Sequence, residues 1–207
     1  MAAFDAALRH GADMIELDLQ CAADGTIVVL HDETLRRLWG IDRPVSAIGW
    51  GELAVIEHDG ACIPSFSMVL EHIAIPLMVD FTGADVVAGA LDAVREAGAL
   101  DRCLFVTGNV PALLSLRDLE AEARIGLTWI EREPPDPAVL LRLRAEFWNP
   151  MFTLVDAAVV EAMHGRGLSV STWTVDEPDV MERMAENRVD AIVSNRIGTL
   201  RRLLDAR

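Results

Sequence analysis

The sequence predicts an α/β fold built on a parallel sheet, arranged either as a barrel or as a doubly wound sheet. Short apolar runs alternate with longer helical patterns along the 207 residues. Several of the apolar runs are continuous, as expected for strands that are covered on both faces. Between them lie helix-start signals, in which an Asp or Asn side chain comes shortly before a proline.

Seven apolar runs are the expected strands. They cover residues 14–19, 27–30, 77–81, 104–107, 126–130, 168–175 and 191–194. The link between the first two is short and contains Asp24-Gly25, which favours a hairpin over a helical crossover. Residues 147–154 also have strand character but contain Pro150, so the number of strands stays open.

Helices are expected between these strands, each with a start signal. They begin at Asp85, Asn109, Asp136, Asp156 and Asp176. The helix over residues 3–10 differs, because only Met1 and Ala2 precede it and neither can cap it. It is either an ordinary frayed terminus or the sign of a chain that lacks its natural beginning.

The composition limits the classes of partner. There are 18 Lys and Arg against 33 Asp and Glu, a formal charge of -15, which argues against nucleic acids and anionic lipid surfaces. Hydrophobic residues make up 52% of the chain, enough for a large core. No apolar run has the length of a membrane span, no signal peptide is visible, and three widely spaced cysteines indicate no disulfide framework. We therefore expect one cytoplasmic globular domain over residues 1–207.

Two carboxylates stand out on the first expected strand. Glu16 and Asp18 are two residues apart, so both project from the same face. A pair that points inward repels itself unless a proton or a cation compensates, and oxygen ligands favour Mg²⁺ or Ca²⁺. The alternative is an edge strand whose carboxylates face water.

Three further side chains fall where strands end, which is where barrel enzymes carry their functional groups. His31 follows the second run and is next to Asp32, which could orient the imidazole or cap a turn. Asp80 lies near the end of the third run, and Trp173 near the end of the sixth. Together with the Glu-x-Asp pair, these residues are typical of a cation-assisted hydrolase site, with Trp173 as an apolar wall or as core packing.

Three stretches of the sequence resemble the glycerophosphodiester phosphodiesterase family: residues 2–40, residues 63–70 and residues 167–195. The ordered series is Glu-x-Asp, then His-Asp thirteen residues after that Asp, then a late Trp-Thr-Val-Asp. The resemblance implies a TIM-type (β/α)8 barrel, one divalent cation, either Mg²⁺ or Ca²⁺, and hydrolysis of glycerophosphodiesters to glycerol 3-phosphate and an alcohol.

The same resemblance implies roles for individual residues. Glu16, Asp18 and Asp80 fall on metal-ligand positions, where Asp80 replaces the usual Glu. His31 falls on one of two histidines that act as general acid and base. Trp173 falls on an aromatic residue near the glycerol moiety.

The sequence also departs from the family pattern. The family's first strand, with His-Arg-Gly and Glu-Asn-Thr, would precede Met1, so we expect a barrel that lacks this strand. Thr82 stands where the family has a charge-stabilising Lys. Such losses cost roughly 10²–10⁴-fold for an acid or base and roughly 10²–10³-fold for an electrostatic stabiliser. Three alternatives follow: an impaired phosphodiesterase, a non-catalytic barrel module, or a phosphodiesterase that acts on lysophospholipids. The sequence leaves oligomerisation open.

Overall fold

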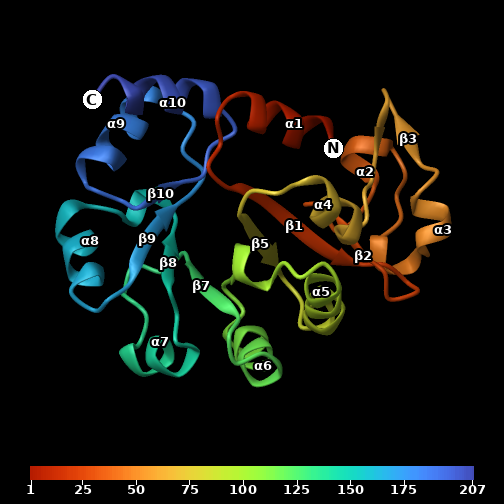
Figure 1. Cartoon of the computed structure of the whole chain (residues 1–207), viewed down its shortest axis with the longest axis horizontal. Coiled ribbons are helices and arrows are strands. Elements are labelled where there is room, and N and C mark those ends of the chain that lie inside the picture. Colours follow the sequence, from red (N-terminus) through yellow and green to blue (C-terminus); the bar gives the residue numbers. More distant parts are fainter.

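A curled eight-stranded sheet surrounded by helices forms the centre of the computed structural model, which describes residues 1–207 (Figure 1). The hydrogen-bonded order is β10-β9-β8-β7-β6-β5-β1-β2. All neighbouring pairs are parallel except β1 with β2, which is antiparallel. The strands are β1 (Ile15–Cys21), β2 (Ile27–Val29), β5 (Leu77–Phe81), β6 (Cys103–Thr107), β7 (Arg124–Trp129), β8 (Phe147–Pro150), β9 (Ser169–Thr172) and β10 (Ala191–Ile192).

Helices connect the parallel strands, and the expectation of a barrel-type α/β fold is confirmed. The longer helices are α1 (Ala2–Arg9), α4 (Phe66–His72), α5 (Asp85–Glu96), α6 (Val110–Leu119), α7 (Pro137–Leu143), α8 (Ala157–His164), α9 (Pro178–Glu186) and α10 (Ile197–Asp205). Each of the seven expected runs contains a strand, and the Asp24-Gly25 link joins β1 and β2 as a hairpin. Residues 147–154, for which the sequence left a strand open, contain β8, which ends at Pro150.

A small lobe follows β2. It contains α2 (Arg36–Trp39), α3 (Trp50–Leu53) and the hairpin of β3 (Glu57–His58) with β4 (Ala61–Cys62), together with one short 3-10 turn (Val45–Ala47). Two more such turns lie elsewhere, at Leu100–Arg102 and Phe152–Leu154. The lobe has a separate core of eight buried residues that includes Leu35 and Leu53.

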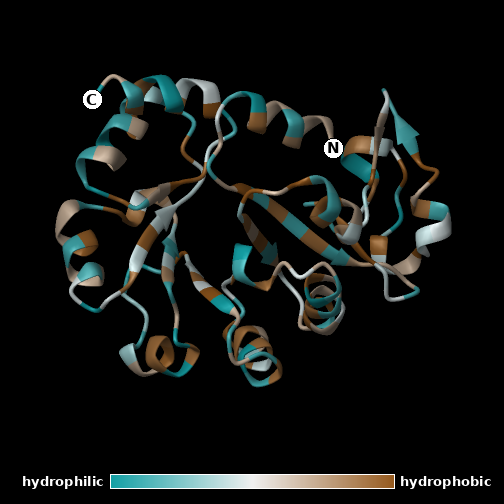
Figure 2. Cartoon of the chain, in the orientation of Figure 1, coloured by the Kyte–Doolittle hydropathy of each residue, from teal (hydrophilic) through white to brown (hydrophobic).

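Alternation along β1 directs its two kinds of side chain to opposite faces of the sheet. Ile15, Leu17 and Leu19 are buried and belong to the main core of 37 residues, which lies between the sheet and the helices. Glu16 and Asp18 occupy the positions between them and face the inside of the curled sheet. Figure 2 shows this alternation as brown and teal bands along β1.

All five expected helices are present, and three of the five start signals act as side-chain caps. Asn109, Asp136 and Asp156 each accept a hydrogen bond from a backbone N–H in the first turn of the following helix. The expected starts at Asp85 and Asp176 are wrong as caps. Asp85 is the first residue inside α5, where its charge favours the helix dipole, and it caps nothing.

Asp176 is used elsewhere. Its carboxylate accepts hydrogen bonds from the Asn195 backbone N–H at 2.8 Å and from the Ser194 hydroxyl at 3.1 Å. It therefore joins the ends of β9 and β10, and α9 begins after Glu177 instead.

Helix α1 has no side-chain cap, as expected. It is nevertheless attached to the rest of the fold, because Asp5 bonds to His72 of α4 at 2.7 Å and Phe4 packs against the main core. No helix combines the length and the apolar character that crossing a bilayer requires.

The sheet is open at one place. The strand order has β10 at one end and β2 at the other, and β2 pairs only with Leu19–Cys21 of β1. The first half of β1 therefore has β5 as its one hydrogen-bonded neighbour and does not pair with β10, as expected for a barrel that lacks one strand. A cavity of about 550 Å³ lies at this opening, with residues of α1, β1 and β10 among its walls. The inward side chain of Glu16 on β1 therefore lines a cavity at this opening.

Candidate functional site

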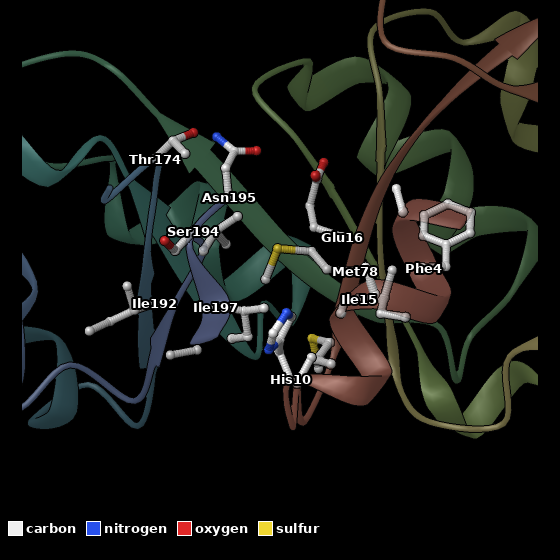
Figure 3. Close-up of a pocket in the computed structure, with 17 residues that line it drawn as sticks. Phe4, His10, Ile15, Glu16, Met78, Thr174, Ile192, Ser194, Asn195 and Ile197 are labelled. Carbon is white, nitrogen blue, oxygen red and sulfur yellow. The ribbon is translucent and has the colours of Figure 1, made fainter. Parts of the chain in front are cut away.

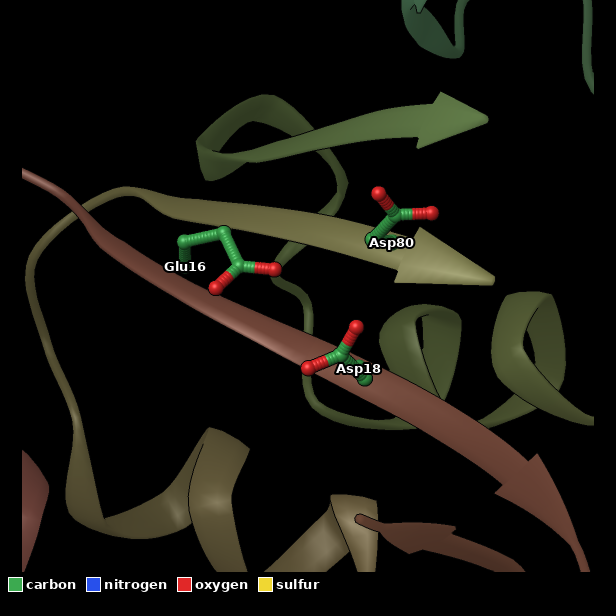
Figure 4. Close-up of side chains that lie close together, drawn as sticks. All are labelled: Glu16, Asp18 and Asp80. Atoms are coloured by element: carbon green, nitrogen blue, oxygen red, sulfur yellow. The ribbon is translucent and has the colours of Figure 1, made fainter. Parts of the chain in front are cut away.

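Three carboxylates from two neighbouring strands converge inside the curled sheet (Figure 4). Asp18 of β1 is the register partner of Asp80 of β5, and Glu16 lies two residues earlier on β1. One oxygen from each carboxylate lies within 4.8 Å of the other two. This set of oxygen ligands suits a hard divalent cation.

Burial and mutual repulsion disfavour the charged form of this cluster. Burial, with the Asp18 and Asp80 charges added, raises the pKa of Glu16 to about 8. Burial and the Asp18 charge raise the pKa of Asp80 to about 7, and burial also raises the pKa of Asp18. No protein cation or hydrogen-bond donor offsets these effects at Glu16. At Asp18 and Asp80 the His31 charge, and at Asp80 also a backbone hydrogen bond from Phe81, offset only part of the rise in pKa. The donor set therefore fits a group that brings positive charge.

A second cluster lies just beyond β2. His31 Nδ1 is 2.9 Å from Asp32 Oδ1, and Arg37 of α2 donates two hydrogen bonds to the same carboxylate. A carboxylate only accepts, so Nδ1 carries the proton and Nε2 is the ring nitrogen left free for a ligand. The hydrogen bond to Asp32 and the Asp18 charge raise the pKa of His31 above its usual range.

The backbone connects this histidine to the acidic cluster. The Leu30 N–H donates to the Asp18 carbonyl at 3.0 Å, so the residue before His31 is tied to a strand that carries two of the carboxylates. The His31 side chain itself is 75% exposed. Its ring is therefore open to solvent beside the acidic group.

Trp173 lies one residue beyond β9 and is half-buried. Its indole N–H donates to the Asn149 carbonyl at 2.9 Å, and its backbone bridges to Met151 of the neighbouring segment. It does not line the 550 Å³ cavity at the sheet opening. Glu16 is the one predicted site residue that lines this cavity.

That cavity has a polar rim around Glu16. In Figure 3 the Glu16 side chain faces Asn195 and Ser194, which follow β10, while the lower part is lined by apolar groups such as Ile15 and Met78. Asn195 is held in place, because its side chain and backbone both donate to Asp176.

The structure thus brings together Glu16, Asp18 and Asp80. His31 lies two residues after the end of β2. Sequence reasoning missed Arg37, which lies five residues after Asp32 and fixes its carboxylate. An Arg five residues after the Asp of a His-Asp pair was the available signal. Thr82, at the position of the expected Lys, is exposed just after β5, and its carbonyl accepts a hydrogen bond from Asn109.

A barrel-type α/β sheet with a carboxylate triad inside and a histidine beside it is an arrangement that a cation-assisted hydrolase can use. The model of the glycerophosphoryl diester phosphodiesterase family matches residues 1–199. The chain belongs to this family.

Similar proteins include named relatives, and a solved structure shares the fold. A glycerophosphodiester phosphodiesterase of Caldanaerobacter subterraneus subsp. tengcongensis is 28% identical over 97% of this chain and 89% of its own. The human protein "Lysophospholipase D GDPD1" is 23% identical over 88% of this chain and 74% of its own. The structure of an Oleispira antarctica phosphodiesterase, in complex with the product sn-glycerol-3-phosphate, has a TM-score of 0.92 at 19% identity, covering 99% of this chain and 90% of that one.

Proposed function

We propose that this chain hydrolyses glycerophosphodiesters to glycerol 3-phosphate and an alcohol, with a divalent cation held by Glu16, Asp18 and Asp80. The observation that carries the proposal is the convergence of three carboxylates with raised pKa values inside a barrel of this family. A cation in this place supplies Lewis-acid polarisation of a phosphoryl oxygen. The remaining work falls to side chains of the chain itself.

His31 is the proposed acid or base. With Nδ1 committed to Asp32, its Nε2 gives or takes the proton that moves between a leaving or attacking oxygen and the protein. Its raised pKa keeps part of the population protonated near neutral pH, which suits either direction of transfer.

Trp173 is the proposed wall for the carbon skeleton of the substrate. Its indole is held by Asn149 at the ends of the strands, the edge at which barrel sites lie. Replacing Trp173 with Ala is expected to raise KM more than it lowers kcat, whereas a packing role alone would lower stability and leave KM unchanged.

The direct test is release of glycerol 3-phosphate from glycerophosphocholine by the 207-residue protein, with EDTA and with Mg²⁺ or Ca²⁺ added back. We expect cation-dependent release that is abolished in Asp18→Asn. Glu57→Gln, on the exposed β3 hairpin, is the matched control and should retain wild-type activity. A comparison of Mg²⁺ with Ca²⁺ in this assay identifies the metal.

The second candidate is a non-catalytic barrel that binds a ligand but does not cleave it. The observation in its favour is Thr82, which offers no positive charge at the end of β5. Cation-dependent binding of glycerol 3-phosphate without any turnover would support this candidate and contradict hydrolysis. Cleavage of lysophosphatidylcholine in preference to glycerophosphocholine would instead assign the lysophospholipid alternative.

We also propose that residues 1–207 act as one cytoplasmic domain. The single domain is supported by the main core, which includes residues of elements from β1 to α10. The location is supported by Cys21, Cys62 and Cys103, which are all free thiols. A single unfolding transition by two optical probes, and recovery in the cytoplasmic fraction of the native host, are the expected results. Two separated transitions would contradict the single domain, and recovery outside the cytoplasm would contradict the location.

A further inference from the structure

We propose that Arg37 is a positioning residue for His31, acting through Asp32. The Arg37 guanidinium holds the Asp32 carboxylate in the orientation that accepts the His31 Nδ1–H and leaves Nε2 free. The catalytic consequence rests on the proposed hydrolysis, whereas the geometric statement does not.

The first support is the geometry of the three side chains. Arg37 Nε donates to Asp32 Oδ2 at 2.6 Å, and Nη2 donates to Oδ1 at 2.9 Å, so the guanidinium engages both oxygens. Two parallel bonds fix the plane of a carboxylate, which a single bond does not. Asp32 Oδ1 is then also the acceptor for His31 at 2.9 Å.

The second support is that little else restrains the imidazole. The His31 side chain is 75% exposed, and Asp32 is its one side-chain hydrogen-bond partner. Packing therefore does not set the ring orientation, and the hydrogen bond does. Asp32 is more enclosed, at 17% exposed, and its carboxylate is held by Arg37 of α2.

The third support is the small stabilising effect expected from such a pair. The Arg37 side chain is 63% exposed, and exposed ion pairs contribute little to the stability of a fold. A role in orienting a neighbour accounts for the two-point contact better than a role in folding.

The neighbouring residue offers a matched control. Arg36 also lies on α2 and is exposed, but its partner is Asp42 at 3.4 Å and it has no bond to Asp32. Arg37→Met and Arg36→Met therefore remove the same charge from the same helix. Only the first removes the contact with Asp32.

The experiment is ¹⁵N and ¹H NMR of the imidazoles in the 207-residue protein, with His31 assigned by comparison with His31→Gln. In wild type and Arg36→Met we expect the neutral ring as the Nδ1–H tautomer. In Arg37→Met we expect mixed tautomers, as in Asp32→Ala. Arg37→Lys, which keeps the charge but not the two-point contact, should be intermediate.

The sign of the change in the His31 pKa separates positioning from simple charge. The charged groups that act on His31 are Asp18, Asp32 and Arg37, and the cation of Arg37 by itself lowers that pKa. Removing Arg37 as a mere charge would raise the pKa. Removing it as the support of Asp32 lowers the pKa toward its usual value, which is the expected result.

A raised pKa with an unchanged Nδ1–H tautomer in Arg37→Met would overturn the proposal. In kinetic measurements, Arg37→Met should lower kcat about tenfold with little change in KM. This loss is smaller than the full contribution of a general acid or base. Arg36→Met should not. Absence of hydrolysis in every variant would count against the proposed function alone, because the NMR result still decides the positioning role.

Discussion

Asp18 and Asp80 face each other as register partners on the adjacent parallel strands β1 and β5. Parallel pairing places side chains of register partners on the same face, so both carboxylates enter the inside of the sheet together with Glu16. The charged carboxylates repel one another. Protons relieve this repulsion at low pH, and in the proposed function a divalent cation relieves it. Its consequences can be measured without any assay of catalysis.

Cation binding should release protons at neutral pH. The pKa of Glu16 is raised to about 8 and that of Asp80 to about 7, so at pH 7 the cluster holds protons that a cation must displace. Affinity is therefore expected to rise as pH increases from 6 to 8. Titration calorimetry of Ca²⁺ or Mg²⁺ in buffers of different ionisation enthalpy measures the released protons, and equal heats in all buffers would contradict the prediction.

Without a cation, Glu16 should make the fold less stable as pH rises. Its pKa in the folded protein lies above the ordinary value of 4.5, so the favourable contribution is complete below pH 4.5 and is lost as pH rises toward 8. Glu16→Gln should therefore raise the melting temperature in EDTA at pH 8 by several degrees. The difference should shrink toward pH 5.

Differential scanning fluorimetry across that pH range checks this prediction. Glu57→Gln, an exposed residue of the β3 hairpin, controls for the loss of one negative charge from an acidic protein. An equal gain in both variants would show that net charge, and not the carboxylate cluster, is responsible.

Asn109 should stabilise the fold through two hydrogen bonds. Its side-chain oxygen caps α6 by accepting from Ala112 N–H, and its amide nitrogen donates to the Thr82 carbonyl just beyond β5. Asn109→Ala is expected to cost about 1–2 kcal/mol of unfolding free energy. Asn109→Asp keeps the cap and loses the donor, so its cost should be smaller. Urea unfolding measures both, and equal costs would mean that the cap contributes nothing.

Phe105 should be among the most costly core residues to truncate. It is 1% exposed on β6 and packs edge-on against Phe81, with ring centroids 6.4 Å apart. Phe105→Ala is expected to cost about 3–5 kcal/mol, because it leaves a cavity between the sheet and the helices. Phe105→Leu should cost clearly less. Guanidinium unfolding provides the values, and a cost under about 1 kcal/mol for Phe105→Ala would show that the site collapses around the smaller side chain.

Local sequence signals predicted much of the fold. Continuous apolar runs located the strands, and Asn109, Asp136 and Asp156 marked helix starts correctly, because a cap acts on backbone groups only a few residues away. Asp176 failed as a start signal because Ser194 and Asn195, distant in sequence, bind its carboxylate instead. A local pattern does not reveal such a competing partner.

The sequence by itself determined that Glu16 and Asp18 share one face of a strand, since side chains alternate along any strand, and its ordered motifs indicated the family. Only the tertiary structure decided that Asp80 joins them in register, that their pKa values rise, and that Arg37 fixes the Asp32–His31 pair. The physical reason is distance. Alternation follows from backbone geometry within a few residues, whereas repulsion, burial and two-point hydrogen bonding depend on which segments the folded sheet and its lobe bring within a few ångströms.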